Sequence, residues 1–214
     1  MDTFEVFGAE AAAARVTDLV AQVRPAAARL AQDGRPLLSP PVAPTRDHWD
    51  GVAPTGSTLV VFGAYGTPWS KPLERVLVEA RHRHLVVWRH YPDPEAHPHA
   101  AMFALAAEAA ASLGKFWALT HEMLRMRHDD PAALHDAMLR AGVDPDHAIA
   151  LMQAGTGTER IVDDVASALA SGVEYEAPTL FVNGTRYGGE LDPAAVVAAL
   201  DTADDDRAAR GPMC

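Results

Sequence analysis

The fold is decided by one stretch of sequence, VFGAYGTPWS at residues 61–70, which joins an apolar run to the start of a helix. The run covers residues 59–65 without a charge, as is typical of a buried central strand. The threonine–proline pair of the quoted stretch supplies a capping hydroxyl and a first-turn proline. We therefore predict a helix over residues 67–81, kinked at Pro72.

The segments that follow extend this pattern. A second buried strand predicted at residues 85–91 completes a strand–helix–strand unit, which implies a parallel strand pair with a right-handed crossover. Helical periodicity then predicts five successive helices, over residues 99–113, 116–127, 131–140, 145–153 and 158–170. Asn183-Gly184 marks a hairpin between strands predicted at 178–182 and 185–187, and a last helix is expected at 193–200.

Composition and charge narrow the function classes. The 214 residues carry a formal net charge of −11, which disfavours binding to nucleic acid. No apolar run reaches the ~20 residues of a membrane span, and the first residues lack the features of a secretory signal. The single cysteine, Cys214, excludes an intramolecular disulfide, and the ten histidines show no convincing ligand spacing, so no metal is expected. These features together predict a cytoplasmic protein.

Several motifs in the same order resemble the DsbA-like thioredoxin-fold family over residues 47–202. Residues 61–70 resemble its first strand and active-site turn, and residues 89–92 and 97–100 resemble the segment that follows its second strand. Residues 177–184 resemble its cis-proline loop and hairpin. Arg46-Asp47-His48 is similar to the start of such domains fused behind antiporters of the NhaA type.

The resemblance implies an α/β, thioredoxin-like fold of the DsbA type. An all-helical insertion would lie between the βαβ unit and the ββα unit, with an N-terminal helix in front. We expect four parts. Residues 1–46 would hold an N-terminal helix (8–32, kinked at Pro25) and an extended proline-rich linker (36–44). The other parts are a thioredoxin-like domain at 47–98 and 172–203, the insertion at 99–171, and a flexible tail at 204–214.

The family's active site has two cysteines at a helix N-terminus, and by resemblance these positions correspond to Thr67 and Ser70. A hydroxyl neither ionises near neutral pH nor forms a disulfide, so dithiol–disulfide exchange by this site is excluded. These two residues are the catalytic candidates, although Thr67 could also serve only as a helix cap. The resemblance further implies a ligand-binding set made of Tyr65, Pro68, Trp69, Ala177 and Pro178, with a cis bond before the last.

Two functions remain open. The first is a redox-inactive binding protein without a cofactor, which holds a peptide or a partner protein in the groove beside Pro178. The second follows from a likeness to kappa-class glutathione transferases and 2-hydroxychromene-2-carboxylate isomerases. In an enzyme of that kind, the Thr67 hydroxyl would stabilise the thiolate of glutathione or mycothiol, and the partner would be a small thiol-bearing ligand.

Overall fold

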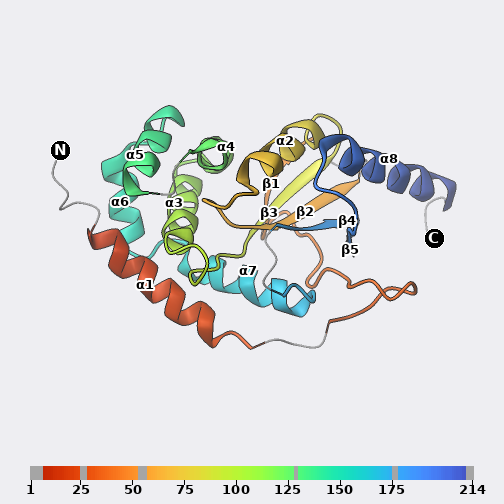
Figure 1. Cartoon of the computed structure of the whole chain (residues 1–214), viewed down its shortest axis with the longest axis horizontal. Coiled ribbons are helices and arrows are strands. Elements are labelled where there is room, and N and C mark those ends of the chain that lie inside the picture. The colour runs from red at the N-terminus through yellow and green to blue at the C-terminus, as the bar shows by residue number, and fades with distance from the viewer. Residues whose placement is uncertain (1–6, 25–27, 53–56, 128–129, 175–177, 211–214) are drawn as a thin grey trace. The chain divides into compact units, whose positions relative to one another are not determined.

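The structure is a computed structural model that describes residues 7–24, 28–52, 57–127, 130–174 and 178–210 (Figure 1). The chain forms two compact units. The first comprises Met1–Arg24, Ala64–Lys71 and His90–Ala166, and the second comprises Pro25–Gly63, Pro72–Arg89 and Ser167–Cys214. Both units are therefore built from segments that lie far apart in the sequence.

The first unit is helical. Its central helix is α3 (Ala100–Ser112), in which residues 100–110 are all buried. Alanine occupies most of these positions, and its small side chain lets neighbouring helices approach closely. The helix α1 (Phe7–Gln22) packs against α3 and against α6 (Pro145–Gln153), so the N-terminal helix belongs to the helical unit. The remaining helices of this unit are α4 (Phe116–Arg125), α5 (Pro131–Arg140) and most of α7 (Thr158–Ala170).

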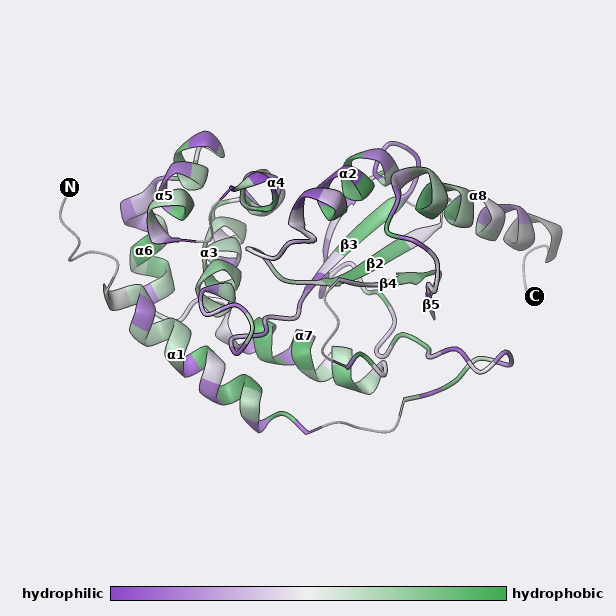
Figure 2. Ribbon diagram, viewed as in Figure 1, coloured by the Kyte–Doolittle hydropathy of each residue, from purple (hydrophilic) through white to green (hydrophobic). Residues whose placement is uncertain are grey.

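The second unit holds a five-stranded sheet with strand order β1-β3-β2-β4-β5. The sheet consists of β1 (His48–Gly51), β2 (Thr58–Gly63), β3 (Leu85–His90), β4 (Thr179–Val182) and β5 (Thr185–Arg186). β1 runs antiparallel to β3, and β4 runs antiparallel to both β2 and β5. The strands β2 and β3 are buried along most of their length, as expected for the interior of a sheet, and β2 is mostly hydrophobic (Figure 2). The remaining helices are α2 (Ser70–Ala80) and α8 (Pro193–Arg210).

The order of elements confirms the predicted fold, but several boundaries were wrong. The first helix ends at Gln22 instead of residue 32, because the chain turns at Gly34 (φ +82°) and Leu30 bridges to Pro36. The kink predicted at Pro25 lies outside the described residues. The strand β1 was not predicted. The last helix continues to Arg210, so residues 204–210 are helical and not a frayed tail.

The stretch predicted as an extended linker, residues 36–44, is anchored within the second unit by Arg89. The fully buried guanidinium makes a two-pronged bond to Asp47, with Nε to Oδ1 at 2.8 Å and Nη2 to Oδ2 at 3.1 Å. It also donates to the carbonyls of Pro40 (2.9 Å) and Pro41 (3.3 Å) and to the hydroxyl of Ser167 (2.8 Å). The five N–H donors of an arginine thereby match five bonds, which is what a buried charge requires.

The same stretch also covers one edge of the sheet. Leu37 bridges antiparallel to Thr185 of β5, and the Leu38 N–H donates to the Gly184 carbonyl at 2.8 Å. The β5 edge is thus paired within the chain by an isolated bridge and one further backbone bond.

Candidate functional site

The turn Thr67–Ser70 is held closed by its own two hydroxyls. The Thr67 Oγ1 accepts the Trp69 N–H at 3.2 Å, and the Ser70 Oγ accepts the Thr67 N–H at 3.1 Å. The two hydroxyl oxygens lie 3.4 Å apart. The Ser70 N–H donates to the Thr67 carbonyl at 3.1 Å. The turn therefore brings together the two catalytic candidates, and the Thr67 hydroxyl closes this turn and does not cap the helix α2, which begins at Ser70.

The helix after this turn begins later than predicted, at Ser70 and not at Thr67. Proline at position 72 explains the difference, because its ring would clash with the carbonyl of residue 68 if the helix reached back that far. Pro72 consequently lies in the first turn of α2, where its missing N–H is not needed, and not in the helix interior.

Two residues of the turn face solvent. The Trp69 side chain is 54% exposed, and Pro68 beside it is also exposed, whereas Ser70 is buried. A large aromatic side chain that remains in water is a natural contact for a ligand, because its burial on binding releases much apolar surface. Of the predicted ligand-binding residues, Trp69 and Pro68 are therefore placed where a partner can reach them.

Tyr65 has a different placement, in the core of the first unit. Its hydroxyl lies 3.1 Å from the Thr120 hydroxyl, and burial raises its pKa well above the ordinary value. Its ring lies beside that of His90, whose Nε2 is 2.8 Å from Glu108 Oε1. Tyr65 is thus a neutral, buried support that precedes the turn, and it does not offer an exposed surface to a ligand.

Pro178 belongs to the second unit, where it borders a pocket of ≈ 280 Å³, which we call the Pro178 pocket. Arg186 and Tyr187 also line the pocket, since the Tyr187 N–H pairs with the Leu180 carbonyl at 2.8 Å. Burial, aided by nearby carboxylates, raises the pKa of Tyr187. The full lining is Pro178, Thr179, Leu180, Arg186, Tyr187, Gly188, Gly189 and Leu191.

The predicted cis bond before Pro178 involves Ala177, which lies outside the described residues. Sequence reasoning missed Arg186 and Tyr187 as pocket residues. The Asn183-Gly184 hairpin could have indicated them, because it folds residue 186 back opposite Phe181 on β4.

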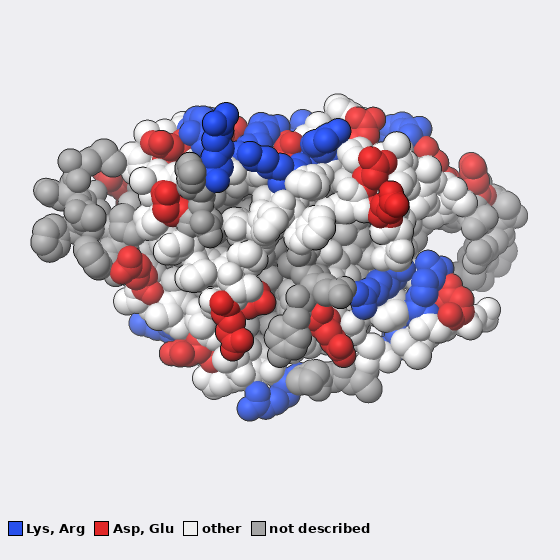
Figure 3. Space-filling model, viewed as in Figure 1, with Lys and Arg blue, Asp and Glu red and all other residues white. Residues whose placement is uncertain are grey.

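The surface carries no strong bias toward one charge on the face that Figure 3 shows, where acidic and basic side chains occur together with much uncharged surface. Among the helices of the described residues, none has the length and apolarity needed to cross a lipid bilayer.

The arrangement of strands and helices defines a thioredoxin-like domain of the DsbA type. The chain belongs to the thioredoxin family, since the family model described as Thioredoxin matches residues 81–202.

Solved structures support this fold at low sequence identity. A thioredoxin-like oxidoreductase from Silicibacter pomeroyi is 22% identical, with a TM-score of 0.63 over 75% of this chain and 93% of that one. BdbD from Bacillus subtilis is 15% identical, with a TM-score of 0.66 over 79% of this chain and 98% of that one. The thiol-disulfide exchange protein α-DsbA2 from Wolbachia pipientis is 11% identical, with a TM-score of 0.61 over 95% and 100%.

The curated proteins that this chain resembles in sequence are named as antiporters. "Na(+)/H(+) antiporter NhaA 1" from Mycolicibacterium gilvum is 32% identical over 194 residues, which is 87% of this chain and 30% of that protein. "Na(+)/H(+) antiporter NhaA 3" from Salinispora tropica is 36% identical over 195 residues, or 88% and 30%. The chain thus spans about 30% of the length of these relatives.

Proposed function

We propose that this domain is a redox-inactive binding module that holds an extended peptide segment of a partner protein. The observation that carries the proposal is the turn Thr67–Ser70, whose two hydroxyls are bonded within the turn, at the positions that by resemblance hold the reactive thiols of the family. A fold that retains its exposed Trp69 but has no dithiol can recognise a partner without modifying it.

The Pro178 pocket supports a peptide as the ligand. Its glycine at position 188 has no side-chain or backbone neighbour within 4 Å of where a Cβ would lie, so another backbone can come close. Arg186 adds a positive charge to the lining. An extended segment with an acidic side chain would satisfy both features, through main-chain bonds and a charge-assisted bond to the guanidinium.

The relatives suggest the class of partner. Each of the two compared relatives is named as a Na(+)/H(+) antiporter, and the part similar to this chain makes up 30% of its length. We propose that the bound segment belongs to a transport protein of that class, so that the domain acts on the transporter by binding.

The experiment is a binding measurement with matched tryptophan variants. Peptides selected from a random 12-mer display library would be titrated into the full chain, its Trp69→Ala variant and its Trp49→Ala variant. Trp49 on β1 is 46% exposed and serves as the control. We expect Trp69→Ala to weaken binding about tenfold or more, while Trp49→Ala leaves it unchanged. Equal affinities for all three proteins would contradict the role of Trp69.

A second candidate function, a thiol-dependent isomerase or transferase, is favoured by one detail of the turn. The Thr67 Oγ1 accepts an N–H from Trp69, so its own proton is free to be donated either to Ser70 or to a bound thiolate. Isothermal titration of glutathione and then mycothiol, with Thr67→Val as control, tests this function. Binding that is lost in the variant would establish it in place of the binding module, and the absence of heat from either thiol would eliminate it.

The loss of redox chemistry can be tested by restoring it. Since the Thr67 and Ser70 hydroxyl oxygens lie 3.4 Å apart, the double variant T67C/S70C should form a disulfide when glutathione disulfide is supplied. We expect this variant to reduce insulin with dithiothreitol as the electron donor and the unmodified chain to show no such activity. Activity in the unmodified chain would overturn the redox-inactive proposal.

A further inference from the structure

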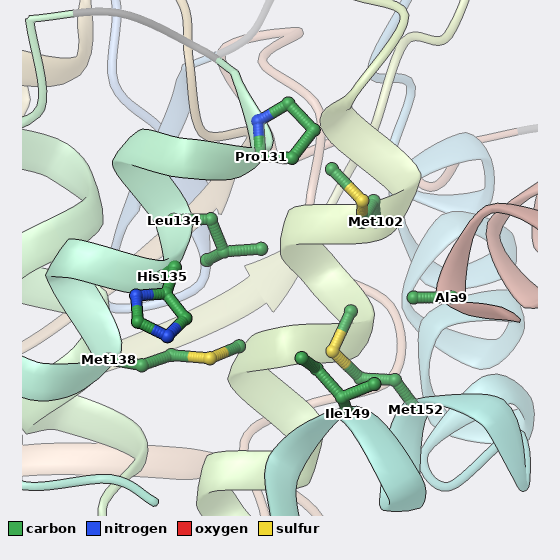
Figure 4. Close-up of a pocket in the computed structure, with 8 residues that line it drawn as sticks. All are labelled: Ala9, Met102, Pro131, Leu134, His135, Met138, Ile149 and Met152. Atoms are coloured by element: carbon green, nitrogen blue, oxygen red, sulfur yellow. The ribbon is translucent and has the colours of Figure 1, made fainter. Parts of the chain in front are cut away.

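Two hollows of the first unit differ in character, and α5 contributes to both. The smaller one, of ≈ 30 Å³, is lined by aliphatic, proline and methionine side chains together with His135 (Figure 4), so it belongs to the packed core. The larger one, of ≈ 370 Å³, is lined by α4, α5 and the residue just beyond the end of α4. We call it the arginine pocket, because Arg125, Arg127 and Arg140 line it.

Two of these arginines converge on one carboxylate. Glu122 of α4 accepts the Arg140 Nε–H through Oε2 at 2.7 Å, and its Oε1 lies 3.5 Å from Arg125 Nη1. Both arginine side chains are still 52% exposed, so a ligand can reach them. The bond to Glu122 occupies only the Nε–H of Arg140. Within the described residues its Nη groups bond to no other protein group, so these donors remain for a ligand.

The lining carries more positive than negative charge. Arg127 is exposed and forms no ion pair among the described residues. The carboxylates of the lining are Glu122 and Asp136, so three arginines leave one net positive charge in a chain whose formal net charge is −11. Figure 3 shows a group of basic side chains over α4 and α5, at the upper left of the view. A cationic hollow on an acidic protein attracts an anion to this one place.

A phosphate group fits this lining better than a carboxylate. Guanidinium groups bind phosphate oxygens through paired, charge-assisted N–H···O bonds. A phosphate monoester carries close to two negative charges near neutral pH and has three acceptor oxygens, so it offers acceptors to more than one arginine. Met126 and Ala133 add an apolar part to the same lining, against which the organic body of an ester can pack.

We propose that the arginine pocket binds a small organic phosphate monoester, with the phosphate on Arg127 and Arg140 and the organic body on Met126 and Ala133. Its volume falls in the range of about 300–1,000 Å³ that is usual for small-molecule sites. Glu122 is a positioning residue, because its bond holds the Arg140 guanidinium in place before the ligand arrives. The pocket shares no residue with the turn or with the Pro178 pocket, so its failure would leave the proposed function untouched.

The experiment titrates phenyl phosphate, inorganic phosphate, benzoate and phenol separately into the full chain by calorimetry. Phenyl phosphate combines the two parts of the ligand, and each of the other probes lacks the ester phosphate or the ring. We expect one equivalent of phenyl phosphate to bind about tenfold or more tightly than any other probe, and to bind less tightly as salt is added. Benzoate or phenol binding as tightly as phenyl phosphate would overturn the proposal, and so would the absence of heat from phenyl phosphate.

Matched arginine variants locate the bound phosphate. Arg127→Gln and Arg140→Gln should each weaken binding of phenyl phosphate about tenfold or more. Arg83→Gln is the control, since Arg83 is an exposed arginine of the second unit that pairs with Asp201 at 2.7 Å, and it should leave the affinity unchanged. Circular dichroism checks that each variant folds, and Arg127, which has no ion pair to lose among the described residues, keeps the test decisive if Arg140→Gln does not fold.

Unchanged affinity in Arg127→Gln would overturn the assignment of the phosphate. A lipid head group offers the same phosphate chemistry from a membrane, and vesicles that contain phosphatidic acid distinguish it from a soluble ester. A chain that sediments with these vesicles but gives no heat with phenyl phosphate would likewise overturn the proposal.

Discussion

The Arg89 anchor of the second unit and the turn Thr67–Ser70 of the first unit are held by different kinds of bond. The anchor encloses a full charge, Arg89, and saturates it with the Asp47 carboxylate, two carbonyls and a hydroxyl. The bonds within the turn and the contact of Tyr65 with Thr120 join neutral groups, although the first unit also buries the carboxylates of Glu108 and Asp164. An ionic anchor of this kind cannot lose one partner without leaving an unpaired buried charge. The comparison teaches that the anchor depends on an ionic pair, whereas the turn is held by neutral hydrogen bonds that each contribute about 1 kcal/mol.

The largest expected effect comes from breaking the anchor. Asp47→Ala leaves the fully buried Arg89 guanidinium without its carboxylate, and we expect the free energy of unfolding to fall by about 3–5 kcal/mol. Equilibrium unfolding in urea, monitored by tryptophan fluorescence, measures the change. A loss below about 1 kcal/mol, the range of exposed pairs, would show that Arg89 finds other partners.

Low pH should weaken the same Asp47–Arg89 pair. Burial alone would raise the pKa of Asp47, but the bonds from Arg89 and from the Ala43 N–H outweigh it, so the folded-state pKa lies below the ordinary value of 3.8. Its stabilising contribution is therefore complete above that value and is lost as pH falls through the folded-state pKa. The urea midpoint of the parent should approach that of Asp47→Ala between about pH 4 and about pH 2. A constant difference between the two proteins over that range would refute the assignment.

A smaller effect is expected in the first unit. Tyr65→Phe removes the buried hydroxyl that contacts Thr120 at 3.1 Å, and one neutral hydrogen bond contributes about 1 kcal/mol. Tyr187→Phe, which removes an exposed bond to the Glu190 carbonyl, is the control and should cost less. If Tyr65→Phe destabilises the chain as strongly as Asp47→Ala, the contrast between the units fails.

The smallest effect concerns an exposed pair in the second unit. Asp33 and Arg35 form a 2.6 Å ion pair with both side chains at least half exposed. Because water and salt screen such a pair, Asp33→Ala should leave the urea midpoint unchanged. A clear loss of stability would instead mean that the turn at Gly34 depends on this carboxylate.

The sequence allowed the architecture to be predicted because each main element carries a local signal. The apolar strands, the caps Asp130 and Asp144, and the Asn183-Gly184 turn all depend on residues within a few positions of one another. The anchor could not be predicted in this way. In the sequence Arg89 is only a charged residue within a predicted strand. Its partners Asp47 and Ser167 lie 42 and 78 residues away along the chain, so no local pattern connects them.

The candidate site could be predicted only in part from the sequence, for the same reason. Thr67 and Ser70 are three residues apart, so their pairing follows from local turn geometry. The exposure of Trp69 and the burial of Tyr65 depend on long-range packing, and the sequence placed both among ligand contacts.

The strand-like segment that pairs with β5 has a practical consequence for how this domain can be shortened. A chain trimmed to the predicted domain start at residue 47 would lose Leu37 and Leu38 and uncover the Thr185 edge. A bare sheet edge is a template for other chains, so such a fragment should aggregate or form intermolecular sheets even if its core is intact. We therefore expect residues 36–38 to protect the β5 edge from pairing with other chains, and a shortened domain should keep them.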